Sequence, residues 1–213
     1  MTPIVIHAGS QEYEALVDAQ LLEKIGALLA QKFRGGPRCA VVSDENVAPL
    51  FGQQVMRSLT EAGFRPVLIT VPAGEESKSL RQAEKVCDQM IAAGLDRSSL
   101  IIALGGGVVG DLAGFVAAIY HRGIPYVQVP TTLLAQVDSS IGGKVAVNHP
   151  RGKNLIGTFH PPFGLNIFVV QALTRAPVAA IYLGVIPFVF LAIVALVIVT
   201  YVPWFSLYLT RFV

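Results

Sequence analysis

Residues 100–111 read LIIALGGGVVGD, a short apolar run that passes directly into three consecutive glycines. The run has the length and the Leu and Ile content of a strand buried on both faces of a sheet. Gly105, Gly107 and Gly110 formally satisfy the pattern G-x-G-x-x-G, in which the lack of Cβ atoms lets the backbone approach a pyrophosphate at the start of a helix. A tight strand-to-helix turn that binds no ligand also matches this pattern. An ordinary Rossmann site is disfavoured, because residues 124–135 lack the acidic residue expected about 20 positions further on.

Outward from this stretch, β-rich runs alternate with longer amphipathic runs. Three of the helical runs end at or near a glycine that tolerates a left-handed cap, namely Gly63, Gly94 and Gly123. Such alternation is typical of an α/β fold, an open parallel sheet with flanking helices. We expect strands at residues 39–43, 66–71, 99–104 and 126–129, and helices at residues 19–33, 47–62, 80–93 and 108–120.

Polar residues gather in two places where predicted strands end. Asp44 ends a strand, where it could bind a ribose or cap the next helix, and the sequence leaves both roles open. After the strand at 126–129, residues 131–154 hold Thr131, Thr132 and many further polar groups. Lysines at 144 and 153 could hold phosphate and carboxylate groups, with Asp138 orienting one of them. We therefore predict a ligand site built from the glycine loop and this segment.

Charge is distributed unevenly. All 14 acidic residues lie between Glu12 and Asp138, and the first 165 residues carry equal numbers of acidic and basic residues. A near-neutral globular part without a basic stripe argues against nucleic-acid binding. Cys39 and Cys87 lie in apolar runs, as buried reduced thiols usually do, and the first residues lack a signal peptide's basic region. These features favour the cytoplasm.

Four motifs occur in order: PAGEESK at 72–78, GGGVVGD at 105–111, VPTTLLAQVDSSIGGK at 129–144 and NHPRGKN at 148–154. Together they resemble 3-dehydroquinate synthase over roughly residues 1–164. The form IGGK at 141–144 is closer to this family than to the related cyclases that make inosose or valiolone rings. The resemblance implies a Rossmann-like NAD-binding domain in residues 1–164.

The resemblance implies a lyase of the shikimate pathway that converts the keto-acid phosphate DAHP into 3-dehydroquinate and phosphate. NAD is used catalytically, transiently oxidising a ring hydroxyl, and the intact family also uses zinc or cobalt and forms a homodimer. By position, the NAD-binding residues are Asp44, Glu75, Lys78, Gly105, Gly106, Gly107, Val108, Val109, Gly110, Asp111, Thr131, Thr132, Lys144 and Lys153. The catalytic and substrate-binding residues are Asp138, Lys144, Lys153, Asn154 and Arg122, the last contacting the substrate phosphate.

The family's metal ligands are a glutamate and two histidines in a helical domain beyond this point of the chain. Residues 165–213 contain no Asp, Glu or His, and His7, His121, His149 and His160 show no metal-ligand spacing. We therefore assign no metal ligand, and expect the chain alone to be inactive as a synthase.

The remaining residues are strongly apolar. Between Arg175 and Arg211, 28 of 35 residues are apolar, and residues 178–202 would give a helix of about 37 Å, enough to span a membrane. A buried core helix is the alternative. The segment weakly resembles the last transmembrane helix of a TRAP-type transporter permease. We interpret residues 165–213 as a chimeric tail, the competing hypothesis being a non-catalytic, membrane-tethered NAD-binding module.

Overall fold

A computed structural model describes residues 3–8, 11–18, 20–160 and 165–168, together with residues 190, 191, 193 and 194. The chain divides into two compact units, Met1–Leu173 and Thr174–Val213. In the second unit, Phe190, Leu191, Ile193 and Val194 are helical and exposed. The fold described below is that of the first unit.

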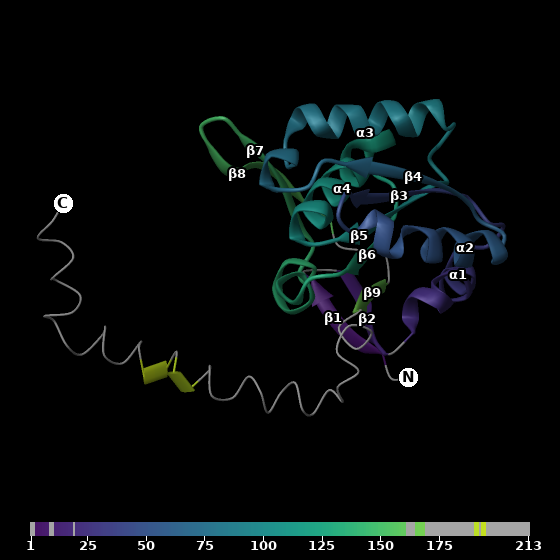
Figure 1. The fold of residues 1–213 in the computed structure, drawn as a ribbon, viewed down its shortest axis with the longest axis horizontal. Helices are drawn as coiled ribbons and strands as arrows, with labels where there is room; N and C mark the ends of the chain where they lie inside the picture. The colour runs from purple at the N-terminus through teal and green to yellow at the C-terminus, as the bar shows by residue number, and fades with distance from the viewer. Residues whose placement is uncertain are drawn as a thin grey trace, which may run out of the picture. The chain divides into compact units, whose positions relative to one another are not determined.

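Seven strands among the described residues form one sheet (Figure 1), in the order β1-β2-β9-β6-β5-β3-β4. All neighbours pair in parallel except β1, which runs antiparallel to β2 at the edge. The α/β class with a parallel sheet is therefore confirmed. The strands are β1 Ile4–Ala8, β2 Gln11–Val17, β3 Arg38–Asp44, β4 Arg65–Val71, β5 Leu100–Gly105, β6 Tyr126–Pro130 and β9 Leu165–Phe168.

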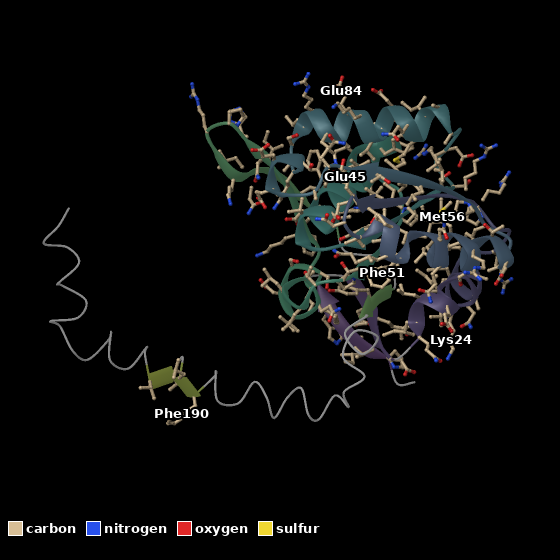
Figure 2. The ribbon with its side chains drawn as sticks, viewed as in Figure 1. Lys24, Glu45, Phe51, Met56, Glu84 and Phe190 are labelled. Carbon is tan, nitrogen blue, oxygen red and sulfur yellow. The ribbon has the colours of Figure 1, made fainter. Side chains whose placement is uncertain are left out.

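Helices cover both faces of the sheet. The α-helices are α1 Leu21–Lys32, α2 Gln53–Glu61, α3 Leu80–Ala92 and α4 Gly107–Ile119, each within two residues of its predicted end except at the start of α2. Residues 47–62 were predicted as one helix, but a π-helical turn, η1 Ala48–Gly52, precedes α2. Helices α1 and α2 contribute to one apolar cluster, where Phe51 and Met56 pack at the margin (Figure 2), and α3 and α4 to the other.

The central strands contribute to both clusters because their side chains alternate between the two faces. In β3, Cys39 and Val41 lie in the cluster with α1 and α2, whereas Ala40 and Val42 lie in the cluster with α3 and α4. Strand β5 is buried along its whole length. This burial on both faces explains why these strands are continuously apolar in sequence.

The connections leave β3 and β5 in opposite directions. Strand β3 leads through α2 to β4 on one side of the sheet, and β5 leads through α4 to β6 on the other. Ligands of open α/β sheets bind at such a switch point, outside the carboxyl ends of the strands. The glycine loop after β5 lies there.

Five strands were not predicted. Strands β7 Lys144–His149 and β8 Gly152–Phe159 form a separate antiparallel hairpin, and β1 and β2 form the antiparallel edge of the main sheet. Strand β9 lies between β2 and β6. Residues 165–168, the first residues of the segment interpreted as a chimeric tail, thus pair with strands of the main sheet.

The predicted transmembrane span at 178–202 lies outside the described residues, except for the four named above. Within the described part of the chain, no helix has the length and hydropathy needed to cross a membrane.

Candidate functional site

The glycine loop joins the end of β5 to the first turn of α4. Gly106 occupies the N-cap position of α4, and no described side chain makes a capping hydrogen bond there. The first amides of a helix lack intrahelical partners and carry the positive end of the helix dipole. An uncapped helix start made of glycines therefore suits an anionic group.

The glycines also meet neighbouring side chains. A Cβ on Gly106 would lie 3.1 Å from Cγ2 of Thr132, and a Cβ on Gly107 would lie 2.9 Å from Oγ of Ser139. The loop therefore packs against the segment that follows β6, the other part of the predicted site. The structure therefore brings the glycine loop and Thr132 together.

Three buried polar atoms beside the loop lack a hydrogen-bond partner among the described residues. They are Thr131 Oγ1, Gln136 Oε1 and Ser139 Oγ. Thr131 lies next to the loop, because its N–H donates to the carbonyl of Gly105 at 2.9 Å. Since most buried polar side-chain atoms in proteins are hydrogen-bonded, such a group of unpaired atoms indicates a place where a ligand supplies partners.

Lys78 connects three segments of the site. The residue is 5% exposed, and its Nζ contacts the Oδ2 of Asp111 on α4. The same ammonium donates to Oδ1 of Asn154 on β8, at 2.5 Å. A buried charge needs such partners, because desolvation without them is costly. The structure thus brings together Lys78, Asp111 and Asn154, which lie up to 76 positions apart in the sequence.

Burial is the largest influence on the pKa of the Asp111 carboxyl. Desolvation raises its pKa above the usual value, the hydrogen bond and charge of Lys78 act in the opposite direction, and the nearby charge of Glu75 adds to the rise. The charged form of Asp111 therefore depends on Lys78.

Asp44 and Glu75 each have a protein partner in this structure. Oδ1 of Asp44 accepts hydrogen bonds from the N–H groups of Asn46 and Val47, at 2.9 and 3.0 Å. The two bonds close the turn between β3 and η1, and the N-cap position of η1 is Val47. Asp44 is therefore not the helix N-cap that the sequence left open beside ribose binding. Oε1 of Glu75 accepts from Nδ2 of Asn148 at 2.8 Å.

The remaining predicted residues are exposed at separate places, and Arg122 lies beyond the carboxyl end of α4, the opposite end of that helix from the glycine loop. Lys144 and Lys153 are exposed and lie near opposite ends of the β7–β8 hairpin, because Lys144 pairs with Phe159 and His149 pairs with Gly152. At ~3.4 Å per residue, about 15 Å of strand separates them, so they do not meet directly. Asp138 is exposed in the π-helical turn Ala135–Ser139, and Arg122 is exposed after α4 with a φ of 69°.

Three positioning contacts involve residues that were not predicted as site residues. Tyr13 Oη accepts from the N–H of Gly142 at 2.8 Å, which anchors β2 to the loop before Lys144. Asn148 bonds to Glu75, and Ser139 lies beside Gly107. The motifs contain Asn148 and Ser139, but Tyr13 lies 129 positions from its partner, and no local pattern could have indicated it.

No group of three His, Cys, Asp or Glu side chains in the described part of the chain could hold a metal ion.

The family model for the 3-dehydroquinate synthase N-terminal domain matches residues 68–182. A 3-dehydroquinate synthase of Pelobacter propionicus is 52% identical over 177 residues, covering 83% of this chain and 49% of that protein. One from Symbiobacterium thermophilum is 53% identical over 169 residues, covering 79% of this chain and 47% of that protein. The chain thus spans about half the length of the curated relatives that it matches.

Two solved structures have a fold similar to that of this chain. A 2-deoxy-scyllo-inosose synthase complexed with carbaglucose-6-phosphate, NAD+ and Co2+ superposes with a TM-score of 0.75 at 28% identity, covering 83% of this chain and 47% of that one. A 2-epi-5-epi-valiolone synthase from Streptomyces hygroscopicus, with NAD+ and Zn2+ bound, gives 0.68 at 32% identity, covering 81% and 47%. These matches lend no support to the likeness of residues 165–213 to a transporter permease, and the family match itself continues to residue 182.

Proposed function

The chain belongs to the 3-dehydroquinate synthase family, and we propose that its α/β unit is the NAD-binding part of an enzyme that converts DAHP into 3-dehydroquinate and phosphate. The two curated relatives, at 52% and 53% sequence identity, are both 3-dehydroquinate synthases. The two cyclases of similar fold hold NAD+ together with Co2+ or Zn2+. By the same resemblance, the proposal includes a homodimer and a cytoplasmic location.

One observation carries the proposal: the glycine-built start of α4 lies at the switch point between β3 and β5, beside buried hydroxyls that have no partner among the described residues. A pyrophosphate fits this place, since it would accept hydrogen bonds from helix amides and from Thr131. Glycine at 105–107 leaves the backbone open to it. Thus the residues present fit a dinucleotide.

The proposed NAD contacts are Asp44, Glu75, Lys78, residues 105–111, Thr131 and Thr132, with Lys144 and Lys153 approaching from the hairpin. When bound, NAD supplies a hydride acceptor. Lys78 is held by Asp111 and Asn154, so its charge is fixed near the glycine loop. Asp138, Lys144, Lys153, Asn154 and Arg122 are proposed to meet the substrate, whose phosphate and carboxylate groups suit the basic side chains.

The Zn2+ or Co2+ of the family is assigned to no residue of this unit. The described residues offer no group of three ligands, whereas such sites need about three protein side chains. The proposal therefore includes no step at a metal.

Calorimetric titration of the 213-residue chain with NAD+ tests the proposal. We expect saturable binding, and at least tenfold weaker binding by Gly107→Val, because its side chain would occupy the place beside Ser139 and obstruct the helix start. Glu61→Gln is the control, since Glu61 is exposed at the carboxyl end of α2. A folded parent chain that binds no NAD+ at millimolar concentration would refute the proposal.

A further inference from the structure

The β7–β8 hairpin is irregular at the residues assigned to ligands. Val147 pairs with Ile156, and His149 pairs with Gly152, so two steps along β7 correspond to four steps along β8. Strand β8 therefore carries two extra residues opposite Asn148, in the segment that contains Lys153 and Asn154. Bulges bend a strand and re-aim its side chains, and they are frequent beside active sites.

The bulge leaves the backbone of Asn154 outside the regular ladder. Asn154 has a φ of 56°, a left-handed conformation that asparagine tolerates better than most residues. Its N–H donates instead to Oδ1 of Asn148, at 2.9 Å. The side chain of Asn148 thus replaces the ladder carbonyl that the bulge removes.

Asn148 also binds the segment that follows β4. Its Nδ2 donates to Oε1 of Glu75 at 2.8 Å, and its backbone N–H donates to the carbonyl of Lys78 at 2.7 Å. Lys78 in turn donates to the side chain of Asn154, which closes a ring of hydrogen bonds. The side-chain amide of Asn148 thus joins Glu75 to the bulge, while the backbone N–H of Asn148 and the ammonium of Lys78 join Lys78 to it.

We propose that Asn148 is a positioning residue that couples the NAD-binding segment at Glu75 and Lys78 to the bulge that presents Lys153 and Asn154. This inference rests on the proposed function. The position requires a donor and an acceptor on one short side chain, because Glu75 accepts and the N–H of Asn154 donates. Asparagine supplies both.

Two variants separate the roles of the two side-chain hydrogen bonds of Asn148, one to Glu75 and one from Asn154. Asn148→Asp keeps an acceptor for the N–H of Asn154 but sets a carboxylate against Glu75. Asn148→Ala removes both bonds. We expect at least tenfold weaker NAD+ binding for both, the effect of losing one hydrogen bond to a charged group. We expect faster hydrogen exchange of the Asn154 amide only in Asn148→Ala.

Rescue distinguishes positioning from a general loss of structure. Adding Glu75→Gln to Asn148→Asp exchanges donor and acceptor, because the new amide can donate to the new carboxylate. We expect the double variant to bind NAD+ more tightly than Asn148→Asp by at least fivefold, with Glu75→Gln alone measured to complete the cycle. Gln54→Glu is the matched control, since Gln54 Nε2 donates to Oε1 of Glu23 on the surface between α1 and α2, at 3.4 Å.

Equal NAD+ affinity of Asn148→Asp and the parent would overturn the inference and leave the proposed function intact. If the double variant bound NAD+ no more tightly than Asn148→Asp, the inference would also be overturned. The loss of affinity in Asn148→Asp would then not arise from the bond between residues 148 and 75. A parent chain without NAD+ binding would overturn both proposals.

Discussion

The ammonium of Lys78 contacts the carboxylate of Asp111, which ties the segment after β4 to the first turns of α4. Asp111 is only 18% exposed in its side chain, and Lys78 still less. Since Lys78 follows β4 and Asp111 lies in α4 after β5, this contact fixes the glycine loop relative to the segment after β4, although β3 separates the two strands in the sheet. The proposed NAD contacts on both segments therefore depend on it.

The pH dependence of stability should report on Asp111. Burial raises its pKa above the usual 3.8, so the folded state binds this proton more tightly than the unfolded chain does. The resulting stabilisation is fully present below about pH 4 and is lost as the pH rises through the folded pKa. We expect the free energy of unfolding of the parent, relative to Asp111→Asn, to decrease from about pH 4 upward. Urea unfolding at several pH values measures it, and a constant difference would contradict the prediction.

Replacing Gly114 by a residue with a side chain should destabilise the fold. A Cβ there would lie 2.5 Å from Cγ1 of Val145 and 3.1 Å from Cε2 of Tyr126. Overpacking of this kind typically costs about 1–3 kcal/mol, so Gly114→Ala should lower the free energy of unfolding by that amount. Gly52→Ala is the control, because its Cβ would make an ordinary 3.5 Å contact with Leu68 and its backbone is helical. Equal stability of the two variants in urea would show that α4 can shift away from β7.

Thr131→Val and Thr132→Val should change stability in opposite directions. Thr131 Oγ1 is buried without a partner among the described residues, so an apolar side chain of the same shape should raise the free energy of unfolding by about 1 kcal/mol. Thr132 Oγ1 accepts from the N–H of Ala135 at 3.2 Å, and its loss should cost about 1 kcal/mol.

NAD+ titration completes this comparison. If Thr131 contacts the ligand, Thr131→Val should bind NAD+ more weakly although it is more stable. A stabilised variant with the parent's affinity would remove Thr131 from the proposed site.

The two cysteines should differ in reactivity. Burial raises the pKa of Cys39 to about 12, and the pKa of the partly exposed Cys87 is also raised, by burial first and by the charge of Asp88. Because the thiolate is the reactive form, we expect slow modification of Cys87 by a thiol reagent at pH 8 and none of Cys39 until the chain unfolds. Mass spectrometry after timed labelling measures both. Rapid labelling of Cys39 in the folded chain would show that β3 opens locally.

The sequence alone determined the central strands, the helices and the glycine loop. Strands such as β5 are buried on both faces, which forces a continuous apolar run, and α3 is bounded by the capping residue Ser79 and by Gly94 after its end. The membrane span at 178–202 stays a prediction from hydropathy. The resemblance assigned Lys78, Asp111 and Asn154 to the site; they meet in the structure, and their roles stay predictions.

Only the tertiary structure decided how the other segments pair. Strand β8 is exposed at most positions, so it lacks the alternation that marks a half-buried strand, and β9 has only four residues. The roles of Tyr13 and Asn148 depend on partners 129 and 73 positions away. Such contacts have no local signature, because chain folding, and not sequence proximity, brings the hydrogen-bonding groups together.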